Sequence, residues 1–154
     1  MAESTGNMVV GFLLGLNHQR VVLVRKNHPA WQKGKLNGVG GHIEAGESPE
    51  TAMVREFQEE TGTVITGWEH YATMTGPNWR VYLFVAMGDL SGIEDTAAAH
   101  RMAGKAVEDI LVKQVDDLRY ENTIGNIPWL VHLALDNGPG KPDWPIMIRY
   151  GLKQ

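Results

Sequence analysis

The chain has 154 residues, a formal net charge of −4 and no cysteine. This length suits one domain with a hydrophobic core, so a single domain over residues 1–154 is expected. The missing cysteines exclude disulfides, thiolate metal ligands and a cysteine nucleophile, and the acidic balance provides no polybasic surface for a nucleic-acid polymer. Since there is neither a membrane-length apolar run nor a basic leader before an apolar stretch, we expect a soluble, cytoplasmic protein without a membrane partner.

The first third of the chain is expected to contain two strands and a long loop. Met8–Leu14 and Arg20–Arg25 are apolar, valine-rich runs separated by turn-forming residues. Asn27–Gly46 is rich in glycine and poor in apolar residues, which predicts a loop carrying a short strand near Leu36–Val39. Loops of this length inside a compact domain are usually functional.

A helix is predicted to follow this loop. Ser48 is suited to the N-cap and Pro49 to the first helical position. The helix should run to about Thr61, where Gly62 is a typical C-terminal stop. Four of its residues share an arc that can pack against a sheet: Met53, Val54, Phe57 and Thr61.

The rest of the chain alternates between apolar runs and turns. Val64–Met74 and Trp79–Met87 are expected to be strands joined by a turn at residues 76–78. Ser91–Gly104 fits either a helical turn or a mobile loop, in which His100 is a candidate for a lid over phosphates. The last expected elements are a strand at Ala106–Val115, a helix at Thr123–Asp136 that stops at Asn137 and Gly138, and an edge strand at Pro145–Tyr150. This order predicts an α/β sandwich on a mixed sheet.

Three glutamates share one face of the helix predicted before Gly62. Glu56, Glu59 and Glu60 stand at i, i+3 and i+4, and Arg55 lies four residues before Glu59, where it can pair with it. Such carboxylates repel one another by roughly 0.2–0.5 kcal/mol per pair in an exposed helix. A divalent cation such as Mg²⁺ converts that repulsion into coordination. A solvated acidic face is the alternative that the helix alone leaves open.

The glycine-rich loop before this helix favours the cation site. Gly38, Gly40 and Gly41 allow the main chain to approach a phosphate or a metal closely. By itself such a loop is only a turn-rich connection. Followed by an acidic helix, it makes a loop–turn–helix unit with oxygen ligands beside the loop.

This unit resembles the Nudix box, G-x5-E-x7-R-E-U-x-E-E-x-G-U, in which U is a bulky apolar residue. Thr63 departs from the pattern at the last position, which serves packing and leaves the chemistry intact. The resemblance implies a Nudix-type α/β/α sandwich around a mixed β-sheet and hydrolysis within a diphosphate link. The matching residues are Gly41, Glu47, Arg55, Glu56, Phe57, Glu59, Glu60 and Gly62.

The resemblance also implies Mg²⁺ or Mn²⁺ as the cofactor, held by residues of the box. Glu59 and Glu60 would be metal ligands, with the Gly40 carbonyl as a further one. Glu56 would be a ligand or the base that activates water.

Residues around these ligands have supporting roles in the resemblance. Arg55 would orient a glutamate, and Glu47 would pair with helix or loop groups. Many Nudix enzymes add a carboxylate from a later loop, for which Glu108, with Asp109 beside it, is the first candidate as a metal ligand. Glu94 and Asp95 come second, and a solvated loop acid is the alternative for each.

The purine-binding residues are inferred from a finer resemblance. The stretch at residues 36–41 is similar to that of MutT-like enzymes acting on oxidised purine nucleoside triphosphates, in which the Asn, here Asn37, can bond the base through both a donor and an acceptor. Trp31 stands where some relatives place an aromatic residue against the base, and Asn126 and Trp129 stand in another base-contacting region. An N-cap role for Asn126 and a core role for Trp129 are the alternatives.

The substrate stays open between several phosphate anhydrides. A nucleoside triphosphate, including an oxidised purine dNTP, is the first expectation, with NMP and pyrophosphate as products. Pro77 lies where ADP-ribose pyrophosphatases carry a proline, although a turn also explains it; Arg80 stands where diadenosine polyphosphate hydrolases carry a tyrosine. ADP-ribose or another NDP-sugar is therefore the second expectation, and a ligand-binding regulator without catalysis the third. Monomer and homodimer are both compatible with the sequence.

Overall fold

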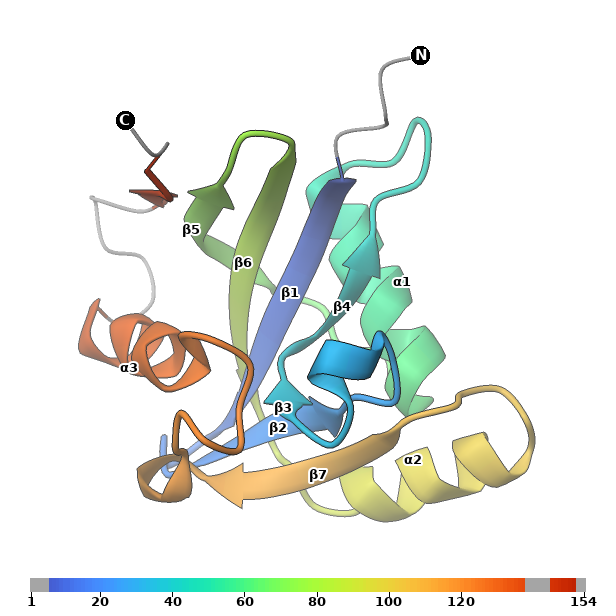
Figure 1. Cartoon of the computed structure of the whole chain (residues 1–154). Helices are drawn as coiled ribbons and strands as arrows, with labels where there is room; N and C mark the ends of the chain where they lie inside the picture. The colour runs from blue at the N-terminus through green and yellow to red at the C-terminus, as the bar shows by residue number, and fades with distance from the viewer. Residues whose placement is uncertain (1–5, 138–144, 152–154) are drawn as a thin grey trace.

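The computed structural model describes residues 6–137 and 145–151, so Gly138 and the chain ends lie outside the described residues. Within these ranges, one mixed sheet carries helices on both faces (Figure 1). The strands are β1 (Gly6–Gly15), β2 (Arg20–Arg25), β3 (Leu36–Asn37), β4 (Val39–His42), β5 (Glu69–Thr75), β6 (Trp79–Gly88), β7 (Asp109–Gln114) and β8 (Ile146–Arg149). The helices are α1 (Pro49–Thr61), α2 (Ile93–Met102) and α3 (Ile127–Asn137), with short 3₁₀ turns at Ala30–Gln32 (η1) and Val115–Asp117 (η2).

β1 lies at the centre of the sheet. It pairs in parallel with β6 along its whole length. On its other side, Met8 to Gly11 pair antiparallel with β4, and Leu13 and Leu14 pair with β2. β2 also pairs with β3 and β7, while β5 follows β6 and β8 forms the edge. The pairing of β4 brings the glycine-rich segment next to the middle of the sheet.

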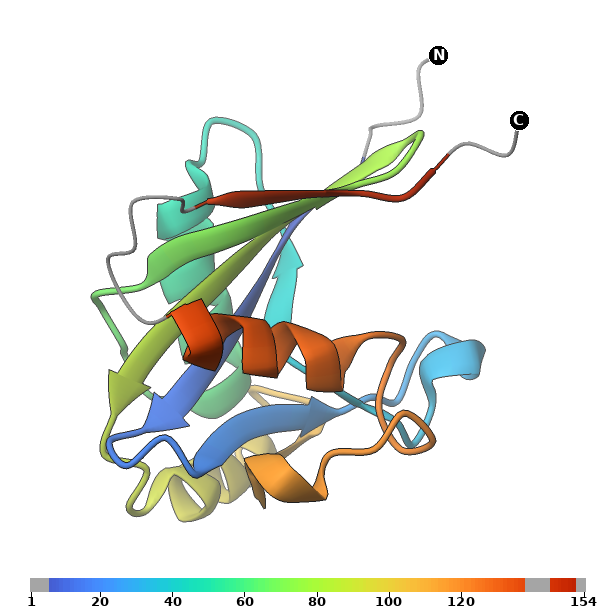
Figure 2. The same cartoon turned by 90° about the vertical axis from the view of Figure 1, so that its left-hand side faces the viewer.

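Side chains of β1 point alternately into two separate hydrophobic cores, one on each face of the sheet. Val10, Phe12 and Leu14 point into the core under α3, whereas Val9 and Leu13 point into the core under α1 and α2. Figure 2 shows α3 in front of the sheet and α1 behind it. The predicted α/β/α sandwich around a mixed sheet is therefore confirmed.

The predicted helix forms α1 with the expected ends. The Ser48 hydroxyl accepts the Thr51 N–H at 3.1 Å, and Gly62 ends the helix with φ 74°. Met53 and Phe57 are fully buried against the sheet. A Cβ on Gly11 of β1 would lie 2.6 Å from Cε of Met53, so a side chain at position 11 would have to displace Met53.

The structure differs from the sequence-based expectations in several places. The helix expected from Thr123 begins at Ile127, and the strand expected from Ala106 begins at Asp109. β5 begins at Glu69 rather than at Val64, because Gly67 takes φ 77° and interrupts the strand. The ambiguous segment before β7 is a helix, α2, that buries Ile93 and Ala97. The expected loop after β2 contains both β3 and β4, whose strand character comes from partners distant in sequence. No helix in the described ranges is both long enough and apolar enough to cross a membrane.

Candidate active site

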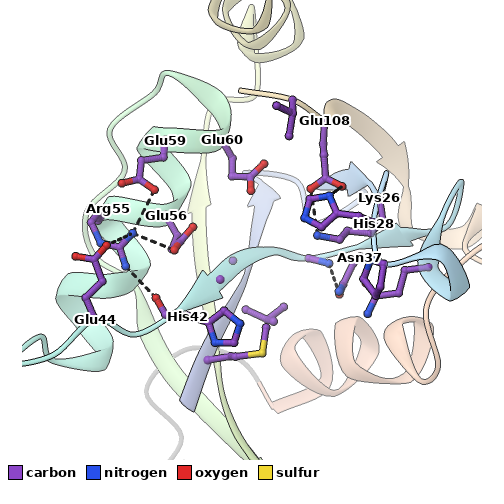
Figure 3. Close-up of a pocket in the computed structure, with 18 residues that line it drawn as sticks. Lys26, His28, Asn37, His42, Glu44, Arg55, Glu56, Glu59, Glu60 and Glu108 are labelled. Atoms are coloured by element: carbon purple, nitrogen blue, oxygen red, sulfur yellow. Dashed lines mark hydrogen bonds and ion pairs between the residues drawn. The ribbon is translucent and has the colours of Figure 1, made fainter. Parts of the chain in front are cut away.

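A cleft of about 470 Å³ lies where α1, β4 and two connecting segments meet (Figure 3). The connecting segments are the stretch after β2 and the residues just before β7. This volume is within the range of small-ligand sites. The lining combines the box glutamates with residues from elsewhere in the chain: Lys26, His28, Gln32, Asn37, Gly40, Gly41, Glu56, Glu59, Glu60 and Glu108.

Arg55 and Glu47 form the most complete ion pair of the site. Nε and Nη2 of Arg55 donate to the two carboxylate oxygens of Glu47 at 2.7 and 2.8 Å. Glu47 also accepts the backbone N–H of Glu44 at 3.0 Å. The hydrogen bonds from Arg55 are the main cause that lowers the pKa of Glu47 to about 2. This pair ties α1 to the loop that precedes it.

The same guanidinium also contacts glutamates of α1 itself. Nη1 of Arg55 donates to Glu56 at 2.9 Å and to Glu59 at 3.2 Å, so the pairing expected between Arg55 and Glu59 is present. Nη2 donates to the carbonyl of His42 at 3.0 Å. All three nitrogens of Arg55 are thus engaged by protein groups, and the side chain orients carboxylates within the cleft.

The glycines of β4 allow Glu56 to lie against the main chain. A Cβ on Gly41 would lie 2.5 Å from the carboxylate of Glu56, and one on Gly40 would lie 1.9 Å from the carbonyl oxygen of Val9. Gly40 therefore has no room for a side chain, whereas a side chain at position 41 would displace the Glu56 carboxylate. Burial is the first cause that raises the pKa of Glu56, and the contact with Arg55 opposes it.

Glu60 and Glu108 approach the cleft from opposite walls (Figure 3). Glu108 is only 3% exposed; it accepts from Nζ of Lys26 at 3.1 Å and from the backbone N–H of Asn27. Glu60 has no hydrogen bond or ion pair within the described part of the chain. Burial first, and the negative charge of Glu108 second, raise the pKa of Glu60 to about 7, while Lys26 opposes the shift.

This donor set fits a hard divalent cation. Glu56 and Glu60 are partly desolvated carboxylates whose charge the protein does not fully compensate, and Mg²⁺ takes oxygen ligands of this kind. In residues 6–137 and 145–151, no three His, Asp or Glu side chains already converge on one point. Mg²⁺ commonly keeps waters and shares substrate phosphates, so a site with few protein ligands suits it.

Asn37 lines the end of the cleft that is away from Arg55 and Glu56 (Figure 3). Its Oδ1 accepts the backbone N–H of Gly38 at 2.8 Å, which fixes the orientation of the amide. The amide NH₂ has no partner among the described residues. It is therefore a free hydrogen-bond donor at the cleft, which Val10, Pro29 and Gln32 also line.

Other residues selected from the sequence lie outside the cleft lining. Trp31 is 65% exposed on η1, and Trp129 is 45% exposed on α3, where it is not a core residue. The side-chain amide of Asn126 bonds the hydroxyl of Tyr150 instead of the first turn of α3. Glu94 and Asp95 are exposed in the first turn of α2 and do not line the cleft.

Lys26 and Asn27 were not evident from the sequence, although both hold Glu108. The antiparallel pairing of β2 with β7 places Arg25 opposite Asp109, so the residues beyond Arg25 meet those before Asp109. The only signal in the sequence is that a basic residue follows an apolar strand, which is common in unrelated proteins.

The fold and the cleft define a class of protein: an α/β/α sandwich with a carboxylate-lined cleft between a glycine-rich strand and an acidic helix. A family model described as "NUDIX domain" matches residues 7–129. The chain therefore belongs to the Nudix family.

Individual relatives match shorter parts or only the fold. An ADP-sugar pyrophosphatase of Mus musculus is 47% identical over 47 residues, which are 30% of this chain and 22% of that protein. An 8-oxo-dGTP diphosphatase of Escherichia coli (strain K12) is 42% identical over 55 residues, which are 36% of this chain and 42% of that protein. The matches thus span less than half of either relative. The NUDIX domain of Shewanella oneidensis NrtR, crystallised with ADP ribose, superposes with a TM-score of 0.66 at 18% identity, covering 87% of this chain and 88% of that one.

Proposed function

We propose that the chain is a Mg²⁺- or Mn²⁺-dependent pyrophosphohydrolase that converts a nucleoside triphosphate to NMP and pyrophosphate. The observation that carries the proposal is one cleft that is lined by Glu56 and Glu60 of the box, by Glu108 and by the Asn37 amide. A polyanionic substrate needs cations in so acidic a cleft. Lys26, His28 and His42 are the basic side chains of the described lining that are not fully engaged as Arg55 is.

In the proposed reaction, water attacks a phosphorus atom of the diphosphate link. A new P–O bond forms, the bridging P–O bond breaks, and pyrophosphate leaves with the bridging oxygen. When bound, the cation neutralises phosphate charge and lowers the pKa of a coordinated water. Glu59 and Glu60, with the Gly40 carbonyl and Glu108, are proposed to hold it.

Glu56 is the proposed acceptor of the water proton. Its side chain is 13% exposed, and burial raises its pKa, which makes the carboxylate a better proton acceptor. Arg55 holds one of its oxygens at 2.9 Å and so fixes its direction. Arg55 and Glu47 are accordingly proposed as the pair that positions this base.

A purine base is the proposed occupant of the Asn37 end. The free amide donor of Asn37 complements an acceptor such as a purine carbonyl oxygen or ring nitrogen. The partial match to an 8-oxo-dGTP diphosphatase supports testing oxidised purine nucleotides first. The cleft lining does not include Trp31, Asn126 or Trp129. Contact between these residues and the base requires a substrate that extends beyond the lining, or a chain that closes around the substrate.

The test is a substrate panel with Mg²⁺ or Mn²⁺ and an EDTA control. The panel contains the canonical dNTPs, 8-oxo-dGTP, ADP-ribose and an NDP-sugar, and the products are resolved by chromatography. We expect NMP and pyrophosphate from a purine triphosphate, with the activity lost in EDTA. Absence of turnover of every compound with both metals would contradict the proposal.

Hydrolysis of ADP-ribose or another NDP-sugar is the second candidate. The partial identity with an ADP-sugar pyrophosphatase and the fold shared with an ADP-ribose-bound domain favour it. The same panel separates the two candidates, since an NDP-sugar yields two monophosphates and no pyrophosphate. Binding of ADP-ribose in calorimetry without any turnover would instead indicate a ligand-binding regulator.

A further inference from the structure

α2 packs against the same core as the carboxylate helix α1, and His100 of α2 adds a hydrogen bond to α1. Nε2 of His100 lies 2.8 Å from the carbonyl oxygen of Glu59. A carbonyl only accepts, so Nε2 carries the proton and donates it. The carbonyls in the last turn of a helix lack partners within the helix, and His100 supplies one from another element.

The end of α1 is shaped to receive the imidazole ring. A Cβ on Gly62 would lie 3.1 Å from Cγ and Nδ1 of His100, so the absence of a side chain there leaves room for the ring. The neighbouring groups in this turn are already satisfied: the Gly62 N–H bonds Gln58, and the Thr63 N–H bonds the hydroxyl of Thr61. His100 therefore adds a bond from another element to the turn from which Glu59 and Glu60 project.

The next residue of α2 reaches the opposite wall of the cleft. Arg101 pairs with Asp109 at 2.9 Å, one residue after Glu108. Both partners are substantially exposed, so this ion pair contributes little by itself. The position of this ion pair is still informative. Through His100 and Arg101, the last turn of α2 contacts both the segment that carries Glu60 and the segment that carries Glu108.

We propose that His100 is a positioning residue of the cation site. By holding the carbonyl of Glu59, it fixes the last turn of α1 and keeps the carboxylates of Glu59 and Glu60 directed at the cleft. His100 does not itself line the cleft, so it acts through α1 and not on substrate. The inference rests on the proposed function, because it assigns these glutamates to a divalent cation.

The experiment measures Mn²⁺ binding directly, by electron paramagnetic resonance of the free ion in the absence of substrate. His100→Ala is expected to weaken Mn²⁺ binding about tenfold, as groups that hold metal ligands in place typically do. His100→Gln is expected to restore binding, because the glutamine amide can donate from nearly the same position as Nε2. The Mg²⁺ concentration for half-maximal activity should rise with His100→Ala, while kcat at saturating Mg²⁺ stays within about twofold.

Ala98→Gly is the matched control. Ala98 is exposed in the middle of α2, so glycine there destabilises the helix without removing either contact. This variant should lower the melting temperature but leave Mn²⁺ binding unchanged. Equal weakening by Ala98→Gly and His100→Ala would overturn the positioning role, because general loosening of α2 would then be sufficient.

The remaining outcomes separate this inference from the proposed function. Wild-type Mn²⁺ affinity in His100→Ala would overturn the role of His100 alone, as would a failure of His100→Gln to restore binding. A wild-type chain that binds no Mn²⁺ would contradict the proposed function and this inference with it. Faster hydrogen exchange at the amides of Gly62 and Thr63 in metal-free His100→Ala would support the structural step independently of the cation.

Discussion

The two ends of the cleft differ in how firmly their side chains are held. At the carboxylate end, Arg55 binds several glutamates, Lys26 and Asn27 hold Glu108, and His100 holds the last turn of α1. At the other end, Asn37 is fixed only by the N–H of its neighbour and keeps two donor hydrogens free. The carboxylate end is thus preorganised for one kind of chemistry. The Asn37 end is less constrained, so a change there would leave the contacts of the carboxylates in place.

The largest expected effect comes from removing one charge at the carboxylate end. Glu60→Gln should lower kcat/KM by at least about 100-fold, because Glu60 is a proposed cation ligand. The metal-free melting temperature should stay the same or rise, since burial disfavours the ionised form of Glu60. Steady-state kinetics and thermal unfolding in EDTA measure the two effects.

Glu94→Gln is the control for this charge change, because Glu94 is an exposed acid of α2 outside the cleft lining. It should leave kcat/KM within about twofold. Near wild-type activity in Glu60→Gln would show that the carboxylate end does not hold the cation.

Arg55→Lys tests whether the organisation of the glutamates matters beyond their charge. Lysine keeps the positive charge but cannot donate to Glu47 through two parallel bonds while reaching Glu56. We expect kcat/KM to fall about 10-fold to 100-fold and the free energy of unfolding to fall by about 1–3 kcal/mol.

Arg101→Lys is the matched control, since it alters an exposed pair with Asp109. Urea unfolding should show a change of at most about 0.5 kcal/mol. If both variants had the same small effect on stability and activity, Arg55 would contribute only general charge.

Asn37→Ala should change the selectivity for the base without changing the binding of the cation. The lost hydrogen bond should lower kcat/KM for the preferred purine nucleotide by about tenfold and reduce discrimination against pyrimidines. Mn²⁺ affinity should not change, because Asn37 contacts no carboxylate.

Trp129→Ala provides the comparison from outside the cleft lining. It should change kcat/KM by about twofold or less, since Trp129 is exposed on α3. A larger loss in Trp129→Ala than in Asn37→Ala would place the base near α3 and contradict its placement beside Asn37.

The smallest expected effect is on acid stability at the carboxylate end. The pKa of Glu47 in the folded chain is about 2, below its ordinary value of 4.5, so the ionised side chain stabilises the fold above about pH 4.5. That contribution is lost as the pH falls from 4.5 toward 2. Glu47→Gln should therefore be less stable than wild type by about 1–2 kcal/mol at neutral pH, with the difference shrinking through this window in metal-free urea unfolding. A difference that is independent of pH would mean that Glu47 stabilises by packing and not by charge.

Features that depend on residues close together in the chain could be predicted from the amino-acid sequence alone. The acidic face of α1 follows from i, i+3 and i+4 spacing, its start from the Ser48 cap, and its end from Gly62. The strand patterns and the central helix were also sufficient to predict the sandwich. These features could be predicted because helical geometry and capping bonds act within a few residues.

The distant residues that join this helix are known from the folded structure and not from local patterns. The pairing of β2 with β7 brings Lys26 and Asn27 to Glu108, and the packing of α2 brings His100 to Glu59. The folded structure also leaves Trp31, Asn126 and Trp129 outside the cleft lining. Their positions in the sequence had suggested that they contact the base. Strand register and helix docking depend on the burial of whole surfaces, and no local pattern along the chain records which surfaces will meet.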